Sequence, residues 1–133
     1  MLDFDGLYQI IPLGPEYGPE VAEFLMSHFL LEEPLNRATR MSRASFKPFV
    51  EKLLERTLGV PFSYAIIERQ SNDIVACAMS SLWENKPSEE HVGDEFVFDA
   101  EKNASIEAVG KILTGLHAKL FELRPELQRV LHL

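Results

Sequence analysis

The sequence has a single cysteine, Cys77, and no long apolar segment. One cysteine cannot form an internal disulfide or a paired CxxC site, which favours a reducing compartment. The apolar stretch at residues 21–31 is interrupted by Glu23 and His28, and it falls short of the roughly 18 apolar residues of a membrane span. The acidic N-terminus also lacks the basic region that begins a secretory signal. We therefore expect a cytoplasmic protein that makes no contact with a membrane.

Basic side chains are scarce in this chain. It has 13 Lys and Arg residues against 21 Asp and Glu residues, for a formal net charge of −8. This charge opposes the phosphate neutralisation by which proteins bind nucleic acid, so no nucleic-acid partner is expected. A negative field would concentrate a cationic ligand such as an amine, although ordinary solubility is the simpler explanation of the same charge.

The familiar catalytic signatures are also missing. Gly110 and Gly115 have the spacing of a phosphate-binding P-loop, but the Lys-Ser/Thr pair that such a loop requires does not follow them. The histidines show no HExxH motif, so we expect isolated, helix-packed histidines and no metal site. They are His28, His91, His117 and His132. No serine lies in a GxSxG motif, and burial in an apolar run would make Cys77 a poor nucleophile by raising the pKa of its thiol. We therefore exclude hydrolases.

The length and composition suit one small domain. With 133 residues, 46% hydrophobic and 26% charged, the chain can bury one core. Strand-like runs occur at residues 8–13, 63–69, 74–82 and from 130 onward, with a polar turn between the second and third. Helical periodicity fills the intervals, and an acid-rich loop is expected between residues 84 and 104. This order predicts an α+β fold in which one mainly antiparallel sheet carries helices on its faces.

Each of the three predicted helices has one apolar face. The first face consists of Val21, Phe24, Leu25, His28 and Phe29, spaced as core residues. The second helix has Ser45 as its expected N-cap, Pro48 in its first turn and Gly59 as its terminator. Its apolar face consists of Phe46, Phe49, Val50, Leu53, Leu54 and Leu58. Ser105 is expected to cap the third helix, which ends before Pro125. Its apolar face consists of Ile106, Val109, Leu113, Leu116 and Leu120.

Two acids, Glu32 and Glu33, stand where the first helix must end. Pro34 follows them, and proline lacks an N–H donor and disfavours helical geometry in the residue before it. Negative side chains are unfavourable beside a helix C-terminus. The pair is therefore either a solvated pair of acids or is placed there for a function.

The residues around these acids resemble a known family. The run 21–25 (VAEFL), then Phe29, then 33–36 (EPLN) is similar to the N-terminal motif of invertebrate dopamine and arylalkylamine N-acetyltransferases of the GNAT superfamily. The hairpin at residues 64–83 is similar to the second and third strands of the GNAT fold. The resemblance spans roughly residues 8–133, and it implies the α+β fold of that superfamily.

The resemblance also implies a reaction and a site. Such enzymes transfer an acetyl group from acetyl-CoA to a small primary amine, which must first lose a proton because its pKa lies near about 10. The glutamate of the motif falls on Glu33, which would act as the general base through a water molecule. Glu32 would raise the pKa of Glu33 by like-charge repulsion. Phe29, Pro34 and Leu35 would bind the substrate.

One part of the family pattern is absent. The Arg/Gln-x-x-Gly-x-Gly/Ala loop that holds the pyrophosphate of acetyl-CoA at a helix N-terminus does not occur between Met1 and Leu133. We therefore expect residues 1–133 to form a single, incomplete N-acetyltransferase domain, with weak or no binding of acetyl-CoA and no identified cofactor residues. The alternative is a non-catalytic module that binds a partner or forms a homodimer through an exposed sheet edge from Val130 to Leu133.

Overall fold

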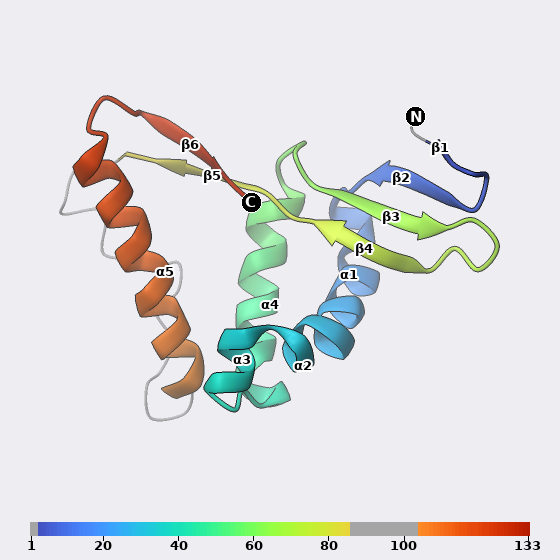
Figure 1. Cartoon of the computed structure of the whole chain (residues 1–133), viewed down its shortest axis with the longest axis horizontal. Helices are drawn as coiled ribbons and strands as arrows, with labels where there is room; N and C mark the ends of the chain where they lie inside the picture. The colour runs from blue at the N-terminus through green and yellow to red at the C-terminus, as the bar shows by residue number, and fades with distance from the viewer. Residues whose placement is uncertain (1–2, 86–103) are drawn as a thin grey trace.

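A computed structural model describes residues 3–85 and 104–133, which form an α+β structure with antiparallel sheets (Figure 1). The predicted fold class is therefore confirmed. The strands are β1 (Asp3–Phe4), β2 (Tyr8–Pro12), β3 (Tyr64–Glu68), β4 (Ile74–Ala78), β5 (Ser81–Glu84) and β6 (Arg129–His132). The helices are η1 (Pro15–Tyr17), α1 (Gly18–Phe24), η2 (Leu25–Phe29), α2 (Leu30–Glu32), α3 (Pro34–Ala38), α4 (Arg43–Leu58) and α5 (Ala104–Leu123). The acid-rich loop predicted from the sequence lies largely outside the described residues.

The strands form two sheets where the sequence predicted one. Strands β1 to β4 pair in chain order, whereas β5 pairs with β6 in a separate two-stranded ribbon. The predicted hairpin between β3 and β4 is confirmed, with Ala65 opposite Cys77. The expected single strand at 74–82 is interrupted because the Ser80 N–H donates to the Ser63 hydroxyl at 3.0 Å. The chain therefore bends between β4 and β5, and β6 follows β5 away from the larger sheet (Figure 1).

Helix α4 packs its predicted face into the core but begins earlier than predicted. Its N-cap is Ser42, whose hydroxyl accepts the Ser45 N–H at 3.1 Å, so the prediction of Ser45 as the N-cap is wrong. The earlier start places Pro48 beyond the first turn, inside the helix. Gly59 occupies the C-cap as predicted.

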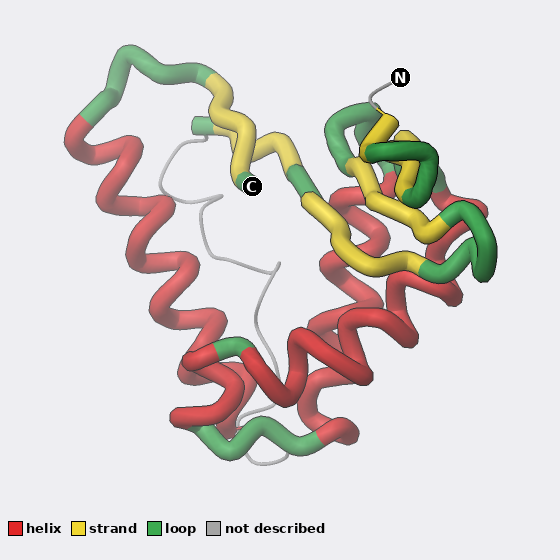
Figure 2. Tube along the Cα trace, turned by 45° about the vertical axis from the view of Figure 1, so that its right-hand side comes forward, coloured by secondary structure: helices red, strands yellow, loops and turns green. Residues whose placement is uncertain are grey.

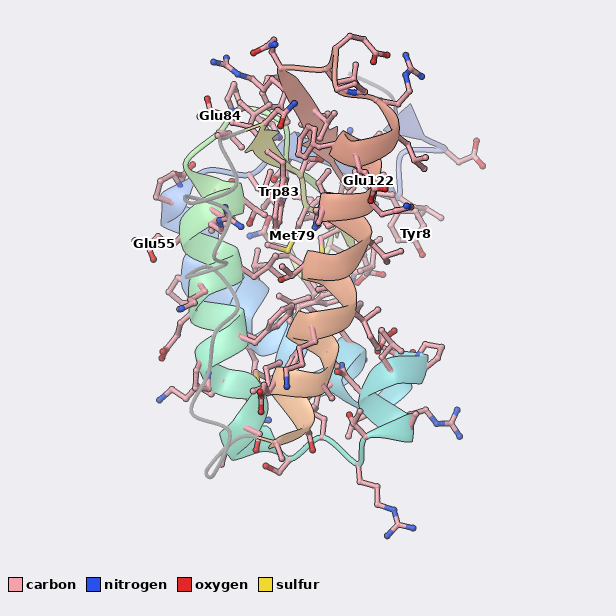
Figure 3. The ribbon with its side chains drawn as sticks, turned by 90° about the vertical axis from the view of Figure 1, so that its left-hand side faces the viewer. Tyr8, Glu55, Met79, Trp83, Glu84 and Glu122 are labelled. Carbon is pink, nitrogen blue, oxygen red and sulfur yellow. The ribbon has the colours of Figure 1, made fainter. Side chains whose placement is uncertain are left out.

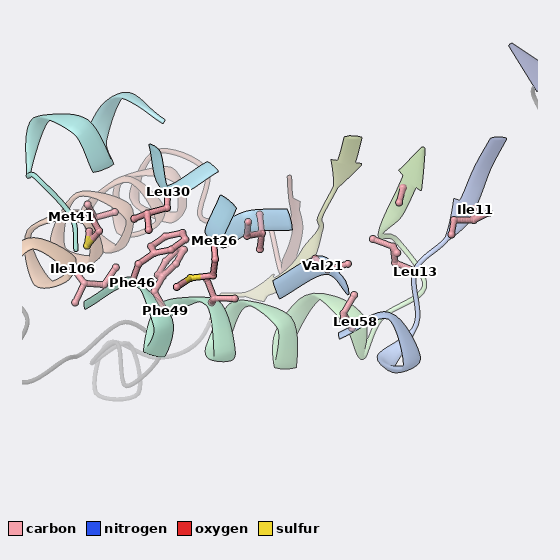
Figure 4. Close-up of a cluster of buried hydrophobic side chains, with 14 residues drawn as sticks. Ile11, Leu13, Val21, Met26, Leu30, Met41, Phe46, Phe49, Leu58 and Ile106 are labelled. Carbon is pink, nitrogen blue, oxygen red and sulfur yellow. The ribbon is translucent and has the colours of Figure 1, made fainter. Parts of the chain in front are cut away.

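The core lies between the larger sheet, the first helices and α4 (Figure 4). Phe46 of α4 is 1% exposed and its ring lies 5.5 Å from that of Phe49. Val21 of α1 is fully buried, and Ile106 joins the same cluster from α5. Each fully buried side chain of this size contributes roughly 1.5–3 kcal/mol of hydrophobic stabilisation. Segments η1, α1 and η2 thus pack against α4, and α3 packs against α5.

Helix α5 buries Ile106 and Val109 as predicted but departs from the predicted face in its second half. Leu116 is 63% exposed, because the buried positions run through Ile106, Val109, His117 and Phe121. Ser105 lies within the helix, and its hydroxyl donates to the Thr39 carbonyl at 2.9 Å. Figure 2 shows the rest of α5 standing apart from α1, with the β5–β6 ribbon connecting the two sides of the molecule. Among the described helices, none is long and apolar enough to cross a membrane.

Candidate functional site

The helix that leads to the two acids changes its winding before it ends. Segments α1, η2 and α2 run without a gap from Gly18 to Glu32, and η2 is a π-helix. A π-helix closes i→i+5 hydrogen bonds, so it inserts one extra residue per turn compared with an α-helix. The buried positions in η2 and directly after it are Leu25, Met26 and Leu30. Such π segments occur frequently at functional sites.

The π-helix places two predicted core residues at the surface. Phe29 is 43% exposed and His28 is exposed, so the prediction that both face the core is wrong. The extra residue rotates them outward and brings Met26 and Leu30 into the core instead. Phe29 still touches the core on one side, because its ring stacks on that of Phe46 with centroids 6.2 Å apart. The Phe29 ring therefore forms the exposed end of a stack of three phenylalanines.

The helix breaks at Glu33, as the sequence predicts. Glu33 has extended backbone geometry (φ −65°, ψ 129°), and Pro34 is the first residue of α3. The Glu33 carboxylate is the N-cap of α3, since its Oε2 accepts the Asn36 N–H at 2.7 Å. An anion is favourable at a helix N-terminus, where unpaired N–H groups gather. The placement that looked unfavourable after one helix is thus favourable before the next.

Glu33 and Phe29 lie on the same side of the chain. The Glu33 N–H donates to the Phe29 carbonyl at 3.0 Å, which is the i→i+4 bond of a helical turn. Residues with this spacing share a helix face, with Cβ atoms about 5–6 Å apart. Glu33 is half-buried, and its Oε1 is not used by the N-cap bond, so one carboxylate oxygen remains for a ligand or a water molecule. We call residues 29–36 the Glu33 turn.

The other predicted site residues take different positions in the Glu33 turn. Glu32, the last residue of α2, is exposed, and so is Pro34. Leu35 is half-buried and packs against the core. The structure thus brings Phe29 and Glu33 together at the surface, whereas Leu35 lies against the core. The sequence reasoning did not single out Asn36, because Glu33-x-x-Asn36 does not match the Ser/Thr-x-x-Glu/Gln pattern of a capping box.

A second group of interacting side chains lies where α4, α5 and the β5–β6 ribbon meet. The ring of Trp83 stacks on that of His117 at 3.5 Å between centroids, and the His132 ring meets it edge-on at 5.8 Å. The guanidinium carbon of Arg56 lies 4.7 Å from the centre of the Trp83 ring. Figure 3 shows Trp83 between α4 and α5. We call Arg56, Trp83, His117 and His132 the Trp83 cluster.

The Trp83 cluster overturns the prediction of isolated histidines for two of the four. The rings of His117 and His132 lie 4.6 Å apart, and burial together with the nearby Arg56 charge lowers the pKa of His132. In the described part of the chain, no three histidine, cysteine, aspartate or glutamate side chains gather as metal ligands would. Burial raises the pKa of the Cys77 thiol, as predicted.

The fold described here matches about half the length of N-acetyltransferases from insects. The chain matches arylalkylamine N-acetyltransferase 2 from Aedes aegypti with a TM-score of 0.67 at 20% identity, over 93% of this chain and 57% of that one. It matches a putative arylalkylamine N-acetyltransferase 7 from the same mosquito with a TM-score of 0.70 at 16% identity, over 93% of this chain and 50% of that one.

A third match is the polyamine N-acetyltransferase of Drosophila melanogaster, an enzyme that forms N-acetylagmatine. Its TM-score is 0.66 at 19% identity, over 94% of this chain and 57% of that one. The chain therefore spans between half and three fifths of the length of these three structures. No protein-family model and no curated protein sequence matches the chain. At these identities the likeness establishes the fold.

Proposed function

We propose that this chain forms the amine-binding side of an acetyl-CoA-dependent N-acetyltransferase, with Glu33 as its general base. The observation that supports the proposal is the Glu33 turn, where a half-buried, backbone-held carboxylate shares a face with the exposed Phe29 ring. A carboxylate binds an ammonium group, and an aromatic face packs well against an aromatic ring. A small primary amine with an aryl group meets both requirements.

The chemistry that this site supplies is the removal of a proton. The ammonium form of the amine gives one proton, through a bridging water molecule, to the Glu33 carboxylate, and the nitrogen regains its lone pair. The Phe29 ring holds the aryl group during this step. Pro34 prevents α2 from continuing through the Glu33 turn, and Leu35 packs the turn against the core.

The acyl donor in this proposal is acetyl-CoA, which supplies the thioester carbonyl that the free amine attacks. The described residues offer no glycine-rich loop at the start of a helix to hold its pyrophosphate. Helix α3 begins with the Glu33 carboxylate, which would repel phosphate, and the Ser42 side chain caps α4. The proposal therefore assigns the amine side of the reaction to this chain and derives no step through the acyl donor.

The experiment is an acetyl-transfer assay of the protein expressed from its complete coding sequence. Phenethylamine and agmatine are the substrates, because the structural matches include enzymes named for arylalkylamines and for N-acetylagmatine formation. We expect turnover of phenethylamine, with Glu33→Gln lowering kcat by about a hundredfold or more. Glu32→Gln is the matched control, because it removes the neighbouring, exposed carboxylate, and it should cause a much smaller loss of kcat. Unchanged kcat in Glu33→Gln at neutral pH would refute the base assignment.

The alternative function is a non-catalytic dimerisation module. The observation that favours it is the exposure of Leu131 (53%) and Leu133 (81%) on and beside β6, whose outer edge pairs with no other described strand. Such an edge can pair with a second copy of the chain. Light scattering of the wild-type protein and of Leu131→Lys tests this function. A wild-type dimer and a Leu131→Lys monomer, with no acetyl transfer by either protein, would favour the module.

A further inference from the structure

Asn36 is a buried polar residue at the centre of the Glu33 turn. Only 3% of it is exposed, and it lies in the first turn of α3, three residues after Glu33. Its side-chain Nδ2 donates to the Phe29 carbonyl at 3.2 Å, and its backbone N–H donates to Glu33 Oε2 at 2.7 Å. A buried amide is retained where its hydrogen bonds are made, and here they join the two proposed ligand-contacting residues.

These hydrogen bonds span the break between α2 and α3, where the regular i→i+4 backbone hydrogen bonds of the helix stop. Pro34 has no N–H to continue the bonding of the preceding helix, and Glu33 has left helical geometry. Without a further link, the bend at Glu33 would be held by the Glu33 N–H bond to Phe29 and the packing of α3. The Asn36 side chain adds that link, since it reaches back seven residues to the same Phe29 carbonyl that accepts the Glu33 N–H.

The result is a closed set of hydrogen bonds that connects Phe29, Glu33 and Asn36. The Phe29 carbonyl accepts two N–H donors, and the Glu33 carboxylate is fixed through the Asn36 backbone. Helix-face geometry sets the Phe29 and Glu33 Cβ atoms about 5–6 Å apart. The ring and the carboxylate therefore start from neighbouring points on one face, within reach of the two ends of a short arylalkylamine. A displacement of about 1 Å in such a site can lower the rate a hundredfold.

We infer that Asn36 is a positioning residue that fixes the distance between the Phe29 ring and the Glu33 carboxylate, and thereby selects primary amines by the length of the linker between ring and nitrogen. The inference rests on the proposed function, since it assigns Phe29 to the aryl group and Glu33 to the amine. It adds the residue that sets the spacing between them, which the sequence resemblance did not assign.

The test compares kcat/KM for benzylamine, phenethylamine and 4-phenylbutylamine, in the protein expressed from its complete coding sequence. Asn36→Leu and Asn36→Asp have nearly the shape of asparagine, retain the backbone N–H to Glu33, and lack the Nδ2 donor. We expect the wild-type preference for phenethylamine over 4-phenylbutylamine to fall by about tenfold or more in both variants. Thr39→Val at the C-cap of α3 is the matched control, because the Thr39 hydroxyl bonds only the carbonyls of Leu35 and Asn36 among the described residues. It should leave the preference unchanged.

Phe29→Leu keeps the test decisive if the Asn36 variants do not fold, because Phe29 is partly exposed and its replacement is tolerated more readily. It should remove the preference among the three amines while transfer persists. Selectivity that survives in folded Asn36 variants, or in Phe29→Leu, would overturn the inference. Two other results would contradict the proposed function itself. They are full activity in Glu33→Gln and a wild-type protein that acetylates none of the three amines, and either result would also overturn the inference about Asn36.

Discussion

Glu33 has two roles in the proposed enzyme, and two substitutions separate them. Its carboxylate caps α3, and the same carboxylate is the proposed base. Glu33→Asn replaces it with one of the strongest N-cap residues but removes the base, whereas Glu33→Gln removes the base and weakens the cap. If Glu33 only caps α3, Glu33→Gln should impair the protein and Glu33→Asn should not. If Glu33 is also the base, both variants should lose the same factor in rate.

The magnitudes follow from the geometry. Loss of an N-cap costs about 0.5–2 kcal/mol of unfolding free energy, so Glu33→Gln should lower the Tm by several degrees and Glu33→Asn much less. A general base contributes about 10²–10⁴ in rate, equivalent to roughly 2.7–5.4 kcal/mol of the activation barrier. That is larger than the cap energy, so the kinetic loss should not follow the loss of stability.

The assay measures release of the CoA thiol across a pH series, with circular dichroism as the check on folding. Both variants should lose about a hundredfold or more in kcat at pH 7, and recover up to tenfold per pH unit as the amine deprotonates in solution, up to its pKa near about 10. If Glu33→Asn folds normally and retains the wild-type kcat at pH 7, Glu33 is a capping residue and the proposed chemistry is wrong.

Three further predictions concern the stability of the fold, and urea denaturation measures each of them. Phe46→Ala should lower the unfolding free energy by about 3–5 kcal/mol because it empties the centre of the phenylalanine stack, while Leu31→Ala at a 66% exposed position should change it by less than about 0.5 kcal/mol. Ser63→Ala should cost about 1–3 kcal/mol, because the buried hydroxyl joins a carbonyl near the end of α4 to an N–H before β5, and a cost near zero would show that water replaces it. The pKa of His132 is lowered in the folded protein, so the unfolded chain binds more protons as the pH falls below about 6.5, and stability should fall with it. His132→Asn should reduce the difference in stability between pH 8 and pH 5.5, and an unchanged difference would exclude the cluster as the cause.

The regular elements were predictable because their patterns are local. Helix α4 has six apolar residues at helical spacing and a glycine at its end, and its burial follows that spacing. The β3–β4 hairpin follows from two strand-like runs around a polar turn. The break at Glu33 follows from Pro34 alone. In each case a few neighbouring residues determine the outcome.

The elements that were missed depend on contacts between distant residues. The bend between β4 and β5 requires a bond from Ser80 to the Ser63 hydroxyl, seventeen residues earlier. The Trp83 cluster joins residues of α4, β5, α5 and β6, and none of its members has a motif of its own. The capping role of Glu33 is local, but the sequence analysis treated the two acids as the end of one helix rather than the start of the next.

The outward position of Phe29 shows why apolar spacing alone could not predict the candidate site. Residues 21–31 are apolar enough to offer two faces, one through His28 and Phe29 and one through Leu30. In the structure Leu30 of the second face is buried, and from the first face Phe29 keeps only its stack on Phe46 of α4. That choice exposes much of a phenylalanine ring, at a cost in buried apolar area. The same turn of helix places this ring one i→i+4 step from a capped carboxylate, so the local departure from α-helical winding and the proposed amine site have a common origin.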